Sequence, residues 1–284
     1  MITDSFDPVS EEILKASEVP GYAGGPSNVQ GRNFPETVIM TFSERAENLV
    51  REKYSSGVIC SLMPETRIPV YEVSIPDELV PYERKSGASG SSRPERAGGT
   101  ESPTAFFRTG IGAPYAASML EEIIARGGRK FIVFGSCGVL DDVAEGHIIA
   151  PTESYRDEGT SYHYAAPADY ITIRNAHRVA AVMGELSVPC IQGRIWTTDG
   201  LYRETRRNAQ ARRSEGCIAV DMECSVLQAV CDLRDCELYQ FVYAEDSLAG
   251  GLSGGIWDPR GMGQGTSETM DIYVRIALAL AVRV

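Results

Sequence analysis

Hydrophobic residues of this chain form short continuous runs that alternate with stretches of helical periodicity. Residues 37–42 and 130–134 are largely apolar or β-branched at successive positions, which is typical of strands buried on both faces. Residues 113–126 instead repeat apolar side chains with the period of a helix that packs against a sheet. Further strand-like runs are residues 68–75, 147–152, 189–196, 218–220 and 237–244. The alternation predicts an α/β fold.

The pattern is most complete in residues 105–138, which predict a strand, a glycine turn, a helix, a second strand and a second glycine turn. Pro114 suits the first turn of a helix, so the helix is expected to begin near Ala113. The Gly-Gly pair at 127–128 marks its end. Because ligands of α/β sheets collect at the carboxyl ends of strands, both glycine turns are candidate parts of a site.

Three polar side chains lie at these turns: Arg108 and Thr109 at the first, and Ser136 at the second. Glycines let a bound group approach the backbone, and an arginine with two hydroxyls can bind an oxyanion. Short glycine patterns also occur where the chain merely turns tightly. The two turns together therefore leave a small-anion site and a purely structural role about equally open.

Composition limits the class of protein. The 284 residues carry a formal net charge of -12, which argues against general nucleic-acid binding because phosphate neutralisation needs a basic surface. Seven scattered cysteines without paired spacing predict reduced thiols. The chain shows no signal peptide and no apolar run that could span a membrane, so we expect a cytoplasmic protein.

The expected organisation is one domain over residues 1–284, because no linker divides the chain. Residues 1–35 are polar and glycine-containing and are predicted to be an N-terminal extension that wraps the surface or a neighbouring subunit. Residues 77–104 are predicted to be a mobile insertion, since their central part is rich in Ser, Gly, Arg and Pro.

Several chemistries are unsupported. The three histidines have no metal-ligand spacing, so no metal is expected. No serine lies in a Gly-x-Ser-x-Gly elbow, and Cys137 has no assignable base. Tyr115 stands where the last glycine of a Gly-x-Gly-x-x-Gly fingerprint would fall. The aromatic and polar residues 155–164, which include His163, are a candidate pocket wall for a flat polar ligand.

Carboxylates follow other strands: Asp199, Glu223 and Asp246 each come just after an apolar run. A carboxylate can accept two sugar hydroxyl hydrogen bonds, and a carboxylic acid can protonate a leaving group. With the anion binders, this set suits a polyhydroxylated ligand attacked by a small anion. Each carboxylate alone is equally explained as a helix-start charge or a turn cap.

The motifs together resemble the nucleoside phosphorylase family, which includes uridine phosphorylases, hexameric purine nucleoside phosphorylases and related nucleosidases. The likeness is strongest from Arg108 to Ser247 and rests on the order and spacing of six motifs. These are TGIGAP at 109–114, GSCG at 135–138, DEGTSYHY at 157–164, TDGLY at 198–202, DMEC at 221–224 and DS at 246–247.

The resemblance implies a three-layer α/β sandwich with a mixed, barrel-like central sheet flanked by helices. It also implies an oligomer built from dimers, a trimer or a hexamer. The implied reaction is phosphorolytic cleavage of a nucleoside to free base and (deoxy)ribose 1-phosphate, with inorganic phosphate as co-substrate and no other cofactor.

Residue roles follow from matching motif positions. Glu223 and Asp246 match the catalytic groups, and Glu223 with Met222 matches the ribose site. Ser136 and Arg45 match phosphate-binding residues. The base site is implied for Cys137, Gly138, Leu201 and Tyr202.

Two departures concern phosphate. Thr41-Phe-Ser-Glu replaces the usual phosphate loop, and Val133 stands where many members carry a phosphate-binding arginine. Arg108, at the end of an adjacent strand, is our hypothesis for the replacement charge. The same departures keep a nucleosidase as an alternative, and a nucleoside-binding protein without turnover is a second. Asp246 favours a purine, whereas residues 205–207 match weakly the residues that read uracil, so the base class stays open.

Overall fold

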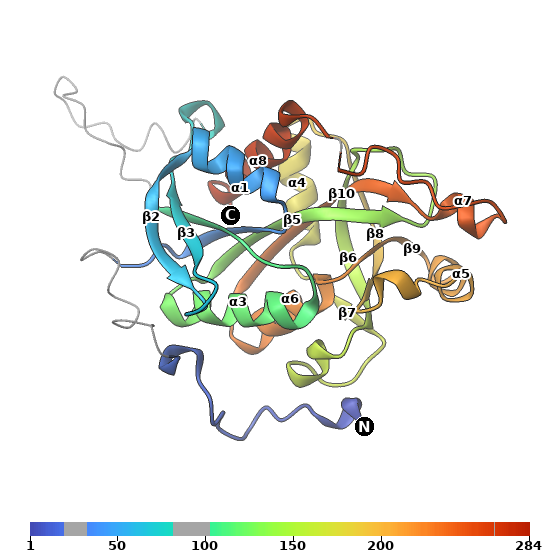
Figure 1. Cartoon of the computed structure of the whole chain (residues 1–284), viewed down its shortest axis with the longest axis horizontal. Helices are drawn as coiled ribbons and strands as arrows, with labels where there is room; N and C mark the ends of the chain where they lie inside the picture. The colour runs from blue at the N-terminus through green and yellow to red at the C-terminus, as the bar shows by residue number, and fades with distance from the viewer. Residues whose placement is uncertain (20–32, 82–102, 264) are drawn as a thin grey trace.

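The structure is a computed structural model that describes residues 1–19, 33–81, 103–263 and 265–284. Within these ranges, ten strands form one mixed sheet with helices on both sides (Figure 1). The strands are β1 (Thr37–Thr41), β2 (Ser55–Leu62), β3 (Ile68–Val73), β4 (Thr104–Arg108), β5 (Lys130–Val139), β6 (Ile148–Asp157), β7 (Tyr170–Thr172), β8 (Cys190–Thr198), β9 (Cys217–Asp221) and β10 (Glu237–Ser247). The longer helices are α1 (Glu44–Lys53), α3 (Ala113–Arg126), α4 (Ala176–Glu185), α5 (Arg206–Ser214), α6 (Cys224–Leu233) and α8 (Ser267–Ala281), and α7 (Ala249–Leu252) is a single turn.

Five of the strands close into a ring, which confirms the barrel-like sheet expected from the sequence. β5 pairs in parallel with β10, β10 pairs with β6, and β6 with β8. β9 then joins β8 to the far end of β5. Four further strands extend the sheet on the other side of β5 in the order β1, β4, β3 and β2, and the short β7 pairs with β6. β5 therefore belongs to both parts of the sheet.

The carboxyl ends of two parallel strands, β1 and β4, lie side by side next to the middle of β5. β1 runs between β4 and β5, and Thr41 stands opposite both Arg108 and Phe134. α3 connects β4 to β5 and crosses β1 on the way. It begins at Ala113, as predicted. The first predicted glycine turn is confirmed: Gly112 ends it with φ of 107°, a region that favours glycine.

The second predicted glycine turn is wrong, because residues 135–138 continue β5. These residues pair with β10, from Gly135 opposite Val242 to Gly138 opposite Asp246. The glycines provide close packing instead of a turn. A Cβ on Gly135 would lie 2.9 Å from Phe42 Cδ2, and one on Gly138 would lie 2.8 Å from Leu248 Cδ1. Side chains at these positions would push neighbouring elements away from the strand.

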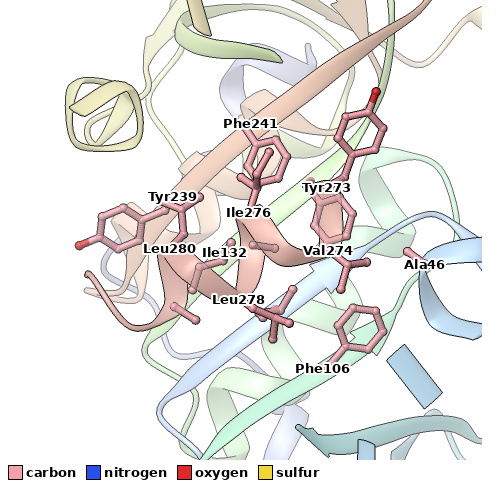
Figure 2. Close-up of a cluster of buried hydrophobic side chains, with 14 of the residues drawn as sticks. Ala46, Phe106, Ile132, Tyr239, Phe241, Tyr273, Val274, Ile276, Leu278 and Leu280 are labelled. Carbon is pink, nitrogen blue, oxygen red and sulfur yellow. The ribbon is translucent and has the colours of Figure 1, made fainter. Parts of the chain in front are cut away.

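Helices cover both faces of the sheet, with α1, α4 and α8 on one side and α3 and α6 on the other (Figure 1). Side chains of β5 alternate between two cores: Ile132 and Phe134 pack with the first group of helices, Phe131 and Val133 with the second. This burial on both faces explains the continuous apolar run of the strand. Figure 2 shows the first core, where Phe241 of β10 lies beside Ile276 of α8.

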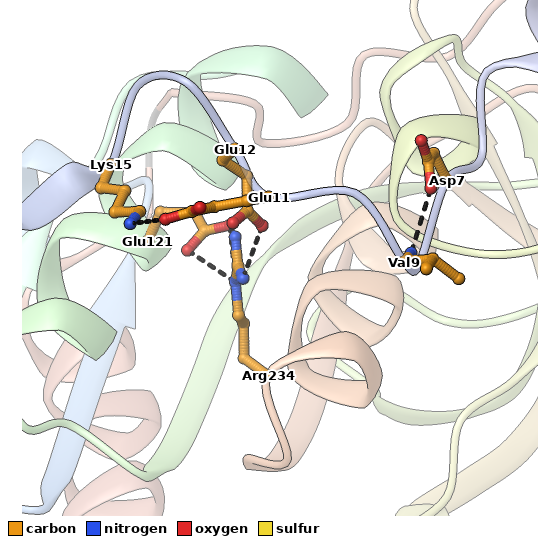
Figure 3. Close-up of polar contacts among 7 residues, drawn as sticks. All are labelled: Asp7, Val9, Glu11, Glu12, Lys15, Glu121 and Arg234. Carbon is orange, nitrogen blue, oxygen red and sulfur yellow. Dashed lines mark hydrogen bonds and ion pairs between the residues drawn. The ribbon is translucent and has the colours of Figure 1, made fainter.

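Residues 1–19 of the predicted N-terminal extension lie along the α3 and α6 side of the protein. An ion pair between Arg234 and Glu12 joins this segment to α6 (Figure 3). Arg234, at the end of α6, pairs with Glu121 of α3 at 2.7 Å and with Glu12 at 2.9 Å. Most of the predicted insertion, residues 82–102, lies outside the described residues. No helix in the described part of the chain is both long and apolar enough to cross a bilayer.

Replacing Phe241 by alanine is expected to lower the free energy of unfolding by about 3–5 kcal/mol. Phe241 is fully buried and stacks on Phe134 with ring centroids 5.4 Å apart, so truncation removes these contacts and leaves a cavity. Denaturant unfolding followed by circular dichroism measures the change. Ile272→Ala, an exposed position of α8, is the control and is expected to change stability by about 0.5 kcal/mol or less. Equal losses in both variants would contradict the prediction.

Candidate active site

A cavity of about 760 Å³ opens where strands of the ring end. Its size is in the range of small-molecule sites. Its wall is drawn from segments far apart in sequence: the second half of β5, the β9–α6 junction, the end of β10, residues 201–206 and the chain around α7. The predicted site residues in this wall are Ser136, Cys137, Gly138, Leu201, Tyr202, Met222, Glu223 and Asp246.

The β5 wall presents one hydroxyl and one inert thiol. Ser136 is exposed on the strand. Cys137 is buried, and its Sγ lies 3.5 Å from the Tyr243 carbonyl oxygen. Burial, followed by the charges of Asp221 and Asp246, raises the pKa of the Cys137 thiol well above its usual value. A thiol held protonated in this way is a packing group and a poor nucleophile.

Glu223 is held at the start of α6 against the first glycine turn. Its Oε1 accepts a hydrogen bond from the Gly112 backbone N–H at 2.6 Å. The contact joins residues 111 positions apart, so the turn after β4 and the turn after β9 form one corner of the cavity. Burial raises the pKa of Glu223, and the neighbouring Asp221 carboxylate raises it further.

Asp221 fixes the backbone that carries Glu223. Its Oδ2 accepts from the N–H groups of Glu223 at 3.1 Å and Cys224 at 2.7 Å. Its Oδ1 accepts from the Thr197 hydroxyl at 2.6 Å. Burial raises the pKa of Asp221, while these hydrogen bonds oppose the shift. In the sequence, Asp221 stood out only as part of the DMEC motif. Its capping role could have been predicted, because aspartate is frequent just before the start of a helix.

The segment that contains His163 supports the same corner from outside. Glu158 accepts from the Ser225 hydroxyl at 2.8 Å and from the Ser161 N–H at 2.9 Å, which ties the segment to the first turn of α6. His163 itself is exposed on the 3₁₀ turn η6 (Thr160–His163) and does not line the cavity. Its predicted pocket role therefore has no support within one chain.

Asp246 lies near the end of β10, beside the glycine wall. Its Oδ2 accepts from Trp257 Nε1 at 2.6 Å, and its Oδ1 is 3.2 Å from where a Cβ on Gly138 would stand. Burial raises the pKa of Asp246, although the Trp257 hydrogen bond opposes the shift. Tyr202 lines the mouth of the cavity with 95% of its surface exposed.

Neither arginine predicted to bind phosphate lines the cavity. Arg108 Nε donates to Glu47 Oε2 at 2.6 Å, and Arg45 Nη1 donates to the Gly265 carbonyl at 2.8 Å. Among the described residues, Arg206 is the basic side chain of the wall, and its Nε donates to the Gly251 carbonyl at 2.9 Å. The Thr109 hydroxyl, between β4 and the Gly112 turn, is buried without a hydrogen-bond partner in the described structure.

Two further polar residues of the wall carried no signal in the sequence. Gln240 is buried in β10 and donates to the Cys224 carbonyl at 3.2 Å, so it supports the start of α6 from a second strand. Glu204 precedes α5, and burial raises its pKa to about 7. Across the described ranges, no three His, Cys, Asp or Glu side chains are grouped to bind a metal ion.

Glu223→Gln is expected to stabilise the protein at pH 8 by about 1–3 kcal/mol and to have little effect near pH 4.5. The folded pKa of Glu223 is raised from 4.5 to about 8, so folded wild type retains a proton there that the unfolded chain releases. Wild-type stability therefore falls as pH rises through this window, and glutamine removes the loss. Urea unfolding at both pH values measures it, with exposed Glu268→Gln as control. If the difference in unfolding free energy between Glu223→Gln and wild type were the same at both pH values, the raised pKa of Glu223 would be refuted.

Comparisons with known proteins identify chains of similar sequence. The chain is 24% identical over 178 residues to guanosine phosphorylase of Halorubrum lacusprofundi, covering 60% of this chain and 72% of that protein. It spans about half the length, 54%, of an uncharacterized protein of Acanthamoeba polyphaga mimivirus, with 28% identity over 138 residues that make up 48% of this chain.

Two solved structures share the fold at 18% sequence identity. Purine nucleoside phosphorylase of Toxoplasma gondii, in complex with immucillin-H, superposes with a TM-score of 0.65 over 87% of this chain and 90% of its own. Uridine phosphorylase of Vibrio fischeri ES114 superposes with a TM-score of 0.64 over 96% and 97%. The family model described as the phosphorylase superfamily matches residues 56–258. On this match and on the ring of strands around the cavity, the chain belongs to the phosphorylase superfamily.

Proposed function

We propose that this protein is a nucleoside phosphorylase that acts on a purine nucleoside. The observation that carries the proposal is that Glu223, Met222 and Asp246, each matched to a family role, line one cavity of the right size. Phosphate oxygen attacks the anomeric carbon of the sugar, the bond from that carbon to the base nitrogen breaks, and its electron pair leaves with the base. The products are free base and (deoxy)ribose 1-phosphate.

The sugar is assigned to the corner formed by Glu223 and the Gly112 turn. Glu223 accepts hydrogen bonds from two sugar hydroxyls in this proposal. Hydrogen bonds donated to a carboxylate favour its ionised form, so sugar binding lowers the pKa that burial has raised in the empty protein. The Asp221 clamp supports the assignment, because a sugar-binding carboxylate needs a fixed backbone. Met222 of the same wall packs beside the sugar ring.

The base is assigned to the side of the cavity formed by Cys137, Gly138, Leu201 and Tyr202. Asp246, at this side, is the proposed general acid that gives its proton to the departing base. Burial raises the pKa of Asp246, which favours the protonated form that the step requires. Uridine phosphorylases lack an acid at this position, so Asp246 supports a purine.

Phosphate is assigned to the aligned ends of β1 and β4, beside the middle of β5. Ser136 faces the cavity, and the unpartnered Thr109 hydroxyl stands close to these strand ends. Arg45 and Arg108 supply the positive charge in this proposal, each after exchanging its present partner for phosphate. We also propose, on the family resemblance, that the chain assembles as dimers within a trimer or hexamer.

A nucleosidase of the same fold is the second candidate, with water as the nucleophile. The observation that favours it is the engagement of both arginines outside the cavity, together with apolar Val133 in the wall. A cavity wall with valine at this position of β5 attracts a dianion less than a wall with arginine there.

A nucleoside panel distinguishes the two candidates. Release of base from inosine, guanosine, adenosine and uridine is measured with and without phosphate, and sugar 1-phosphate is assayed. Phosphate-dependent release from the purine nucleosides is expected. Asp246→Asn should lower kcat by about 10²–10⁴-fold because the leaving base is no longer protonated. Release without phosphate would identify a nucleosidase, and an unimpaired Asp246→Asn enzyme would remove Asp246 from the mechanism.

Arg108→Ala is expected to raise the KM for phosphate at least about tenfold while leaving the KM for nucleoside near the wild-type value. The reason is the loss of a charge-assisted contact to the anion. Because Arg108 also pairs with Glu47, the double variant Glu47→Gln, Arg108→Ala separates loss of the cation from exposure of an unpaired carboxylate. An unchanged phosphate KM in both variants would show that Arg108 does not replace the missing family arginine.

A further inference from the structure

An indole ring contacts the proposed general acid, and the mechanism above gives it no role. Trp257 Nε1 donates to Asp246 Oδ2 at 2.6 Å, and the ring also lines the cavity. Trp257 keeps 49% of its surface exposed. Burial of apolar surface therefore explains only part of its placement, and the contact with Asp246 is the more specific feature.

Backbone pairing fixes the indole relative to the carboxyl group. Asp258, the next residue after the tryptophan, forms an antiparallel bridge with Ser247, the next residue after the aspartate. The Ser247 N–H donates to the Asp258 carbonyl at 2.8 Å, and the Asp258 N–H donates to the Ser247 carbonyl at 2.9 Å. The segment that carries Trp257 is thus tied to the end of β10, directly beside Asp246.

An indole nitrogen donates a hydrogen bond but cannot accept one. When the carboxyl group of Asp246 is protonated, Oδ2 remains the acceptor of the Trp257 N–H, and the proton has to lie on Oδ1. Oδ1 is the oxygen on the side of β5, 3.2 Å from where a Cβ on Gly138 would stand. Gly138 belongs to the wall assigned to the base, so the proton lies on the oxygen beside the base.

We propose that Trp257 is a positioning residue, which holds the acidic proton of Asp246 on the oxygen facing the base and stabilises the carboxylate that proton transfer leaves. This role rests on the proposed function, in which Asp246 protonates the departing purine. The Oδ1–H bond breaks, its proton passes to N7 of the base, and its electron pair stays on Asp246. The Trp257 N–H then donates to an ionised oxygen, and charge-assisted bonds are about twice as strong as neutral ones.

The same hydrogen bond acts on the pKa of Asp246. Burial raises this pKa, and the Trp257 N–H opposes the rise because it favours the charged form. The other charged and titratable groups around Asp246 are Glu245 on its own strand, Arg260 on the loop after α7, Glu204 before α5 and Cys137 on β5. Trp257→Phe leaves these groups in place and removes the N–H, so the pKa of Asp246 is expected to rise further.

The experiment measures kcat and KM of Trp257→Phe for guanosine and for 7-methylguanosine. With guanosine, kcat is expected to fall about 10–100-fold, the loss of one hydrogen bond to a charged group, while KM stays near the wild-type value. 7-Methylguanosine carries a positive charge on its base, which leaves without protonation, so its kcat should stay near the wild-type value. Ile256→Ala, at a neighbouring position with 85% of its surface exposed, is the control and should change neither substrate.

The pH profile separates positioning from a structural role. Activity on guanosine needs protonated Asp246, so the fall of kcat/KM at high pH should move to a higher pH in Trp257→Phe, even though the maximum is lower. A loosened loop would instead slow both substrates alike and leave the profile in place. Equal losses on the two substrates, or an unmoved profile, would overturn the role of Trp257.

A spectroscopic readout needs no turnover. The chain has two tryptophans, so the indole N–H signal of Trp257 in the NMR spectrum is assigned by its loss in Trp257→Phe. This signal is expected to shift with pH in wild type and to stop shifting in Asp246→Asn. Such a shift in a protein that cleaves neither nucleoside would overturn the proposed function and support the proton placement. Cleavage without the shift would overturn the role of Trp257 alone.

Discussion

The architecture depends on the close approach of several elements to the second half of β5. This strand pairs with β10 along its length and with β9 at its end, and Phe42 and Leu248 pack directly on its glycines. At Gly138, Leu248, Val220 and Asp246 all come within 3.2 Å of where a Cβ would stand. A side chain there would separate the strand that carries Asp246 from the strand that leads to Glu223. The distance between the carboxyl groups of Asp246 and Glu223 therefore depends on the lack of a side chain at Gly138.

The corner of the cavity formed by Glu223 and the Gly112 turn is held by polar groups rather than by apolar packing. Backbone N–H groups at the start of α6 bond to Asp221 and Thr197, and the Ser225 hydroxyl bonds to Glu158. Each acceptor comes from a different strand or loop, so small shifts of one element are resisted by the others. Glu223 accepts from the Gly112 N–H and lines the cavity, where a carboxyl group can accept further hydrogen bonds from a ligand. A carboxylate so placed lowers stability in the empty protein and gains its partners from a ligand.

Local pattern predicted most of the fold. The apolar run of β5 and the periodicity of α3 were readable because each element is buried in a regular way. β2 escaped notice because most of its residues are exposed or half-exposed and its pairing with β3 is irregular. The glycines of β5 were misassigned because a glycine run looks the same whether it permits a turn or a close approach. The raised pKa of Glu204 and the pairing of Arg108 with Glu47 depend on tertiary neighbours, which no local pattern encodes.

Charge is the constraint that any mechanism at this site has to satisfy. The wall carries the carboxyl groups of Glu204, Asp221, Glu223, Glu245 and Asp246. Burial raises the pKa of several of them, but each one that ionises repels a phosphate dianion. Uncharged donors such as Ser136 and Thr109 orient an anion but offset little of that repulsion. Cleavage by phosphate therefore requires a cation at the strand ends, and one of the arginines has to exchange Glu47 or the Gly265 carbonyl for the substrate. In that exchange phosphate competes with a carboxylate for Arg108 but only with a neutral carbonyl for Arg45. If phosphate is the nucleophile, as proposed, electrostatics therefore favours Arg45 over Arg108 as its first contact.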